Sequence, residues 1–231
     1  MNSTRNSNKA EKRAGAAAPG GDTRERIKRV ASEHYVLYGN DAFNFGDIAD
    51  EIGITRANIH HHFGSKRKLV AELVRDLAGD AEQRIRHHWA RPGVAFAQRL
   101  DEQLDDLRTF YKRFHPKRGD RNVWSPLARI RLDLSSLDSA ATNTLERINK
   151  VYDESLRLAL KEAIMSGELL ATTPVDDVAR LLRVTFLSSP PITQDSGSFA
   201  EIEQLFAALG RTIVAAWGGT RVARRPRATV S

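Results

Sequence analysis

The sequence predicts an all-α protein of about nine helices. From about residue 24 to about residue 217, apolar residues recur at intervals of three and four positions, which is the period of an amphipathic helix. Gly39, Gly53, Pro116 and Gly167 end these patterns after typical helix lengths. No segment has the alternation of a convincing strand and no internal repeat is evident, so mixed and repeat folds are not expected.

The composition limits the possible classes of protein. Of the 231 residues, 41% are apolar and 28% are charged, which is sufficient for a folded core. The sequence contains no cysteine, so disulfides, thiol nucleophiles and cysteine-ligated metals are excluded. The polar first residues lack the apolar stretch of a signal peptide, and no apolar run is long enough to span a bilayer. We therefore expect a cytoplasmic protein without a membrane partner.

The net charge of +7 is concentrated near the two ends of the chain. Residues 1–23 carry four basic and two acidic side chains, whereas residues 218–231 carry four arginines and no acid. Six of the seven positive charges therefore fall in segments that we interpret as a disordered basic arm and an Arg-rich tail. A basic balance suits a nucleic-acid partner but does not indicate a fold.

The first helix is expected to begin at Asp22, where Asp22 and Glu25 form a capping box, and to end at Gly39. A short second helix follows, with Asn44 and Asp47 at its start and Gly53 at its end. Thr55 is expected to cap the third helix. The predicted buried stripe of the first helix comprises Ile27, Val30, Ala31, His34 or Tyr35, and Tyr38.

The spacing of Ala49, Gly53 and Ile59 fits the packing of a helix-turn-helix. The small alanine permits a close helix crossing, the glycine permits a tight turn, and the branched isoleucine holds the second helix in place. An ordinary helical hairpin is the alternative interpretation.

The later helices are predicted from the same signals. One is expected over 96–114, before Pro116, and another over 139–165, before Gly167. Thr173, Pro174 and the acids that follow them predict the start of a helix that runs to 187. A loop over 188–198, which contains two prolines, and a last helix over 199–217 complete the prediction.

The run from Thr23 to about Leu77 resembles the DNA-binding domain of the TetR (tetracycline repressor) family. The first-helix stripe, Gly53, the pair His62–Phe63 and Lys66 all fall in register with that family's signature. The resemblance implies a helix-turn-helix DNA-binding domain over 24–76, with its recognition helix at 55–62. It also implies a larger effector-binding and dimerisation domain over 77–217.

The recognition helix can be divided into an inward and an outward face. Ile59 and Phe63 lie four residues apart and should point into the core, so Arg56 and the histidines face the DNA groove. Arg56 suits guanine, whereas Asn58 suits adenine or serves only as a capping partner. Lys66 suits a phosphate, and the resemblance adds the two positions at the start of the second helix. The expected DNA-binding residues are Asn44, Phe45, Thr55, Arg56, Ala57, Asn58, His60, His61, His62 and Lys66.

His60 and His61 replace two aromatic residues that are usual in the family. A zinc site is disfavoured because consecutive residues on a helix diverge by about 100°. The imidazoles could contact phosphates as tyrosine hydroxyls would, or their protonation could strengthen DNA binding as the pH falls through about 6.5. Phe45 also departs from the small polar residue that is common at its position.

The resemblance further implies that the helices at 175–187 and 199–217 form a four-helix bundle with a second copy of the chain. The apolar character of the first on several faces supports this, and one helix buried within a monomer is the alternative interpretation. Arg131 could meet an anionic group of an effector or could be a surface arginine with a buried stem. The candidate effector-binding residues are Phe110, Phe114, Trp124, Leu127, Arg131, Tyr152 and Phe186.

We therefore expect a homodimeric, ligand-responsive transcriptional repressor, released from a palindromic operator by a small, mostly apolar effector. No catalytic residues, metal ligands or cofactor are expected, because the serines lie in caps and loops and the histidines lack ligand spacing. The alternatives are an enzyme, and a non-specific DNA-binding or adaptor protein whose C-terminal domain binds another protein.

Overall fold

A computed structural model describes residues 19–115 and 119–219. These residues form nine α-helices and one 3-10 helix, so the all-α prediction is confirmed. Most of the predicted arm and tail, residues 1–18 and 220–231, lies outside the described residues. The helices are α1 (Pro19–Ala42), α2 (Phe45–Ile52), α3 (Arg56–Phe63), α4 (Lys66–Trp89), α5 (Phe96–Phe114), α6 (Pro126–Leu132), η1 (Leu134–Ser136), α7 (Ser139–Met165), α8 (Val175–Ser196) and α9 (Ala200–Trp217).

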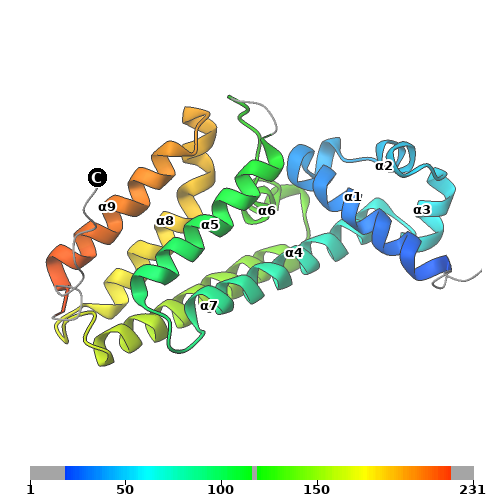
Figure 1. Cartoon of the computed structure of the whole chain (residues 1–231). Helices are drawn as coiled ribbons and strands as arrows, with labels where there is room; N and C mark the ends of the chain where they lie inside the picture. The colour runs from blue at the N-terminus through cyan, green and yellow to red at the C-terminus, as the bar shows by residue number, and fades with distance from the viewer. Residues whose placement is uncertain (1–18, 116–118, 220–231) are drawn as a thin grey trace, which may run out of the picture.

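The molecule has two parts that share one helix. Helices α1 to α3 form one end, while α5, α8 and α9 form the other (Figure 1). Helix α4 runs from the first part into the second and packs along α7. The domain boundary expected at residues 76 and 77 therefore falls inside a continuous helix.

Helix α1 begins earlier than predicted, and its regular part ends at Gly39 as predicted, although the helix continues beyond this kink to Ala42. It begins at Pro19, three residues before Asp22, which is consistent with the tolerance of proline in the first turn of a helix. Its regular backbone is interrupted at Gly39, where φ is 78° and ψ is 175°. Most of the predicted stripe is buried, but Tyr38 is exposed and Val36 is buried in its place.

Helix α8 continues to Ser196, so the loop predicted from Pro190 and Pro191 is wrong. Contacts from outside the segment explain the difference: the indole nitrogen of Trp124 donates to the Thr193 hydroxyl at 2.7 Å, and Pro190 is buried. This packing outweighs the local tendency of proline to end a helix. The predicted start of this helix is confirmed, since α8 begins at Val175, but Thr173 does not cap it, because its hydroxyl donates to the Leu170 carbonyl.

One face of α8 and α9 stays exposed in the single chain. Leu182 and Phe186 are buried, whereas Leu181 and Val184 on α8 are half-exposed, and Val214 on α9 is also exposed. The described chain therefore covers α8 on one side only. Within the described ranges, no helix combines the length and apolar character needed to cross a membrane.

Candidate DNA-binding interface and effector cavity

Two side-chain caps set the geometry of the helix-turn-helix. The Asn44 Oδ1 atom accepts hydrogen bonds from the backbone amides of Gly46 (2.8 Å) and Asp47 (3.1 Å) at the start of α2. The Thr55 hydroxyl accepts from the Asn58 amide (3.2 Å) at the start of α3. The predicted caps by Asn44 and Thr55 are thus confirmed. Asn58 takes part in the second cap through its backbone amide, and its side chain is exposed.

Helix α3 has the two faces that the sequence predicts. Ile59 and Phe63 are buried, and the Arg24 guanidinium lies 4.6 Å from the centre of the Phe63 ring. The opposite face is open to solvent and carries no acid, so it can accept a polyanion. Its exposed members are Thr55, Arg56, Ala57, Asn58, His60 and His61, while His62 is half-buried.

Phe45 is a correction to the predicted contact set. Its side chain is only 8% exposed, and its ring packs edge-on against His60 at a centroid distance of 4.8 Å. A buried aromatic at the start of α2 therefore supports the recognition helix and offers no side-chain surface to DNA. The Nδ1 atom of His60 lies 3.2 Å from the Gly64 carbonyl, which fixes the ring at the end of α3.

Arg56 lies across the first turn of α2. A Cβ atom built on Gly46 would lie 2.4 Å from Arg56 Nη2 and 2.9 Å from Asn44 Oδ1. Gly46 therefore leaves the space in which the guanidinium rests beside the Asn44 cap. This role of Gly46 could not be predicted from the sequence, because the approach of Arg56 depends on the crossing of α2 and α3.

Replacing Gly46 with alanine is expected to displace Arg56 and to lower operator affinity about tenfold, within the range for one arginine-to-base contact. The measurement is titration of the full-length protein onto its operator at fixed salt. Gly79→Ala is the matched control, since a Cβ there meets nothing within 4 Å and should leave affinity unchanged. Equal operator affinity of the Gly46→Ala variant and the wild type would show that the placement of Arg56 is unimportant.

Lys66 lies at the start of α4, after the Ser65 cap. Its Nζ atom is 3.4 Å from the Asp41 carbonyl and 5.9 Å from the Phe43 ring centre. The adjacent Arg67 and Lys68 are exposed. The phosphate contact of Lys66 stays a prediction, and the three cations form a basic turn beside α3.

The second site is a cavity enclosed by α4, α5, α6, α7 and α8. Six of the seven candidate effector residues line it: Phe110, Trp124, Leu127, Arg131, Tyr152 and Phe186. Phe114 does not, because it is buried in a separate cluster with Val36 and Trp124. Its helical spacing placed it on the correct stripe of α5 but one turn beyond the cavity.

The cavity is small, at about 50 Å³. Pockets for small organic ligands usually measure about 300–1,000 Å³. An organic molecule can enter only if the surrounding helices separate. Occupation of this site therefore requires a structural change.

Several polar groups line the cavity. Arg84 and Asp106 approach each other to 3.4 Å, and Arg84 lies 4.6 Å from the centre of the Phe110 ring. Burial is the main cause of the raised pKa of Tyr152, so its phenol stays neutral at ordinary pH. Both ring nitrogens of His88 are buried without a hydrogen-bond partner among the described residues. The sequence did not indicate that Arg84, His88 and Asp106 line the cavity. Asp106 lies one turn before Phe110 on α5, whereas α4, which carries Arg84 and His88, holds none of the predicted effector-binding residues.

Helix α6 connects the cavity to the DNA-binding domain. Leu127 and Arg131 face the cavity, whereas Arg129 donates hydrogen bonds to the carbonyls of Val36 and Leu37 on α1, both at 2.9 Å. These carbonyls belong to the last regular turn of α1, where backbone carbonyls have no hydrogen-bond partner within the helix. We call this contact, together with Asp133, the α6–α1 latch.

Asp133 completes the α6–α1 latch. It accepts a hydrogen bond from the Asn40 amide at 2.8 Å and lies 3.6 Å from Arg129 Nη1. Gly39, which precedes Asn40, has a backbone conformation that is nearly restricted to glycine. A Cβ atom on Gly39 would lie 2.8 Å from Arg129 Nη1. Arg129 and Arg131 are two residues apart on one short helix, so their side chains point in nearly opposite directions. The sequence offers no other sign that these arginines have different partners.

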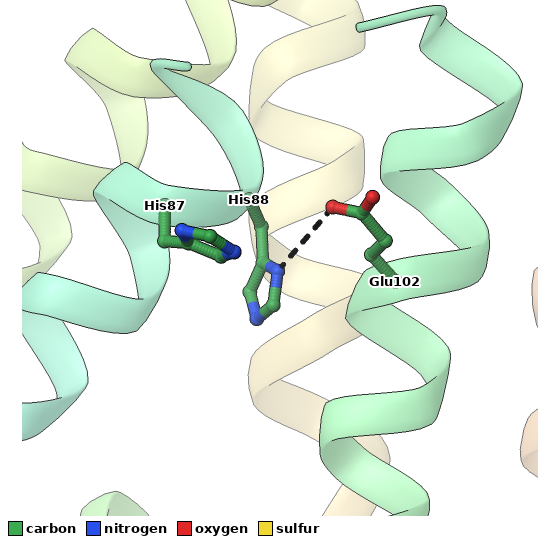
Figure 2. Close-up of side chains that lie close together, drawn as sticks. All are labelled: His87, His88 and Glu102. Carbon is green, nitrogen blue, oxygen red and sulfur yellow. Dashed lines mark ion pairs between the residues drawn. The ribbon is translucent and has the colours of Figure 1, made fainter.

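His87, His88 and Glu102 form the one described group that could hold a metal ion (Figure 2). The two histidines are adjacent on α4, and Glu102 approaches His88 from α5. Arg91 already donates to both Glu102 oxygens, at 2.8 and 2.9 Å, and lies 3.2 Å from His87 Nε2. A guanidinium supplies the positive charge at this cluster, so we assign no metal to it.

Comparisons with known proteins agree with this geometry. Residues 28–73 match the sequence model described as "Bacterial regulatory proteins, tetR family". The HTH-type transcriptional repressor KstR2 of Mycolicibacterium smegmatis is 24% identical over 165 residues, covering 70% of this chain and 75% of that protein. A TetR transcriptional regulator from Chloroflexus aurantiacus has a TM-score of 0.70 at 19% identity, covering 87% of this chain and 98% of that chain. A TetR-family regulator from Agrobacterium tumefaciens has a TM-score of 0.68 at 20% identity, covering 87% of this chain and all of that chain (100%).

The exposed recognition helix, the helical second domain and these similarities define a helix-turn-helix transcriptional regulator. Residues 28–73 match the TetR family of bacterial regulatory proteins, and the chain is similar in sequence and fold to regulators of that family. Proteins of this family are not enzymes, so the enzymatic alternative is excluded.

Proposed function

We propose that the protein is a homodimeric repressor that binds a palindromic operator and is released from it by a small organic effector. The observation that carries the proposal is that α6 lines the cavity with Leu127 and Arg131 and hydrogen-bonds through Arg129 to α1 of the DNA-binding domain. The similar KstR2 is itself a transcriptional repressor, which supports the same direction of regulation.

DNA recognition is assigned to the first turn and outer face of α3. Arg56 and Asn58 are exposed where side chains of a recognition helix reach base edges. The basic turn at Lys66, Arg67 and Lys68 is placed to contact phosphates, which position the helix without reading sequence. Two such helices in a symmetric dimer reach successive major grooves about 34–36 Å apart, so the operator must be palindromic.

Dimerisation is assigned to the exposed face of α8 and α9. Leu181 is 57% exposed and Val184 is 50% exposed in the single chain. Covering apolar area of this kind stabilises an interface by about 25 cal/mol per Å² before association costs. A second copy that presents the same face would bury both residues.

Leu181→Glu is expected to raise the dissociation constant of the dimer at least about tenfold, because a carboxylate would be buried without a partner. Sedimentation of the full-length protein over a concentration series measures this constant. Met165→Glu changes an 80% exposed residue at the end of α7 and should leave the dimer intact. A Leu181→Glu variant as dimeric as the wild type would place the interface elsewhere.

Release is explained by two arrangements of α6. An effector larger than the present cavity would push on Leu127 and Arg131, and α6 would carry that displacement to the α6–α1 latch. A changed separation of the two recognition helices then no longer matches the operator. The effector acts by binding one arrangement more tightly than the other, without competing for the DNA surface.

Selection of genomic DNA fragments by the full-length protein tests the proposed function. A shared palindrome among the retained fragments is the expected result. Retention of fragments without a common sequence would instead favour the alternative, a non-specific DNA-binding or adaptor protein.

A further inference from the structure

Arg131 is a half-buried cation that has no counterion among the described residues. Its Nη2 atom is inaccessible to solvent and has no hydrogen-bond partner, and no carboxylate of the described residues lies within ion-pair distance of it. Burial lowers the pKa of Arg131, but an arginine side chain stays protonated at neutral pH. Such a charge is unfavourable in a protein interior unless something pairs with it.

Two other arginines that are largely shielded from solvent, Arg99 and Arg129, have structural roles that follow from their hydrogen bonds. Arg99 donates to the carbonyls of Val94, His88 and Arg91 and to the Glu162 carboxylate. Arg129 donates to two carbonyls in the α6–α1 latch. Arg131 makes no comparable contacts within the described part of the chain, so its charge is not explained by the fold.

The charges around Arg131 leave it free to bind an anion. Arg84 and Asp106 offset each other on the cavity wall. Arg183, which is close enough to affect Arg131, is paired with Asp153 at 2.7 Å. The cavity therefore has a net charge near that of one guanidinium. His88 also lines it, and its ring nitrogens make no hydrogen bond but lie 3.9 Å from the Glu102 and Asp106 carboxylates.

The remainder of the cavity wall is apolar and aromatic, including Ile85, Leu107, Phe110, Leu127 and Phe186. A ligand that fits must combine an apolar body with one small anionic group. Arginine binds a carboxylate through two parallel hydrogen bonds. A doubly charged phosphate fits less well, because Asp106 lies on the same wall and only one cation is unpaired.

We infer that the effector is an apolar monocarboxylate whose carboxylate pairs with Arg131. This inference rests on the proposed effector response and adds the chemical class of the ligand. His88 supplies a second polar contact, and the apolar body of the ligand separates α6 from the neighbouring helices as it enters.

Matched acids and amides test the inference on the full-length protein. Hexanoate, octanoate and phenylacetate are titrated beside their primary amides, with calorimetry and thermal unfolding as the readouts. We expect at least one acid to bind wild type at least about tenfold more tightly than its amide, as for a charge-assisted pair. Equal binding of every acid and its amide, or no binding of any acid at millimolar concentration, would overturn the inference.

Two variants separate recognition by Arg131 from general packing. Arg131→Met keeps the apolar stem and should abolish the preference for acids, whereas Arg131→Lys should retain part of it. Arg131→Met should also leave the melting temperature of the unliganded protein unchanged or raised, because it removes an unpaired buried charge. A lowered melting temperature together with an unchanged acid preference would assign Arg131 a structural role.

Operator release is measured separately, by adding the acid to the protein–operator complex. Acid binding through Arg131 without release would leave the ligand class standing and contradict the effector response. Release by an amide as effectively as by its acid would contradict the ligand class and leave the effector response standing.

Discussion

Arg129→Met should lower the free energy of unfolding by about 3 kcal/mol, at the lower end of the range for breaking a buried charge pair. The side chains of Arg129 and Asp133 are both only 12% exposed. Methionine would leave the carbonyls of Val36 and Leu37 without their donor and the Asp133 carboxylate without its nearby cation. Denaturant unfolding of the full-length protein measures the loss.

The same variant should loosen the DNA-binding domain. Hydrogen exchange at the end of α1 should accelerate, and operator affinity should fall at least about tenfold because the recognition helices are less well oriented. Arg157→Met is the matched control, since Arg157 and its partner Asp176 are both solvent-exposed and water screens such a pair, so its loss should leave stability and operator affinity nearly unchanged. Unchanged exchange and unchanged operator affinity in Arg129→Met would refute the α6–α1 latch.

Arg56→Ala is expected to relax discrimination at one base pair of each half-site by about 1–3 kcal/mol. The guanidinium rests over Gly46, at the junction of α2 and α3, and is exposed for a bidentate contact with guanine. Binding to a set of operators, each altered at one position, measures the discrimination. A uniform loss across all operator variants would reassign Arg56 to a phosphate.

Lys66→Ala provides the contrasting result. It should weaken binding to all sequences alike and reduce the slope of affinity against salt by about one, as expected for the loss of one phosphate contact. Together the two variants distinguish base reading from positioning.

Local signals were sufficient to predict most of the fold. The bounds of α5 and α7 follow from stripes of apolar residues that end at Pro116 and Gly167, and both match the structure. The end of α8 could not be predicted, because Trp124 anchors Thr193 from a distant part of the sequence. The preferences of Pro190 and Pro191 therefore placed the predicted end of this helix at residue 187, too early in the chain.

The candidate sites could also be predicted only in part from local signals. The exposed face of α3 follows from the four-residue spacing of Ile59 and Phe63, which fixes the inward side of a helix. The burial of Phe45 and the opposite directions of Arg129 and Arg131 depend on how helices cross. Such crossings involve residues far apart in sequence, so periodicity within one helix does not reveal them.

The most direct test of the proposed repressor is its affinity for operators of altered half-site spacing. An insertion of about 5 base pairs, half a turn of B-DNA, turns the two half-sites onto opposite faces of the duplex. A dimer with rigidly spaced recognition helices should then lose specific binding by at least about a hundredfold, approaching the non-specific level. Unchanged affinity after that insertion would contradict recognition of a palindrome by paired α3 helices.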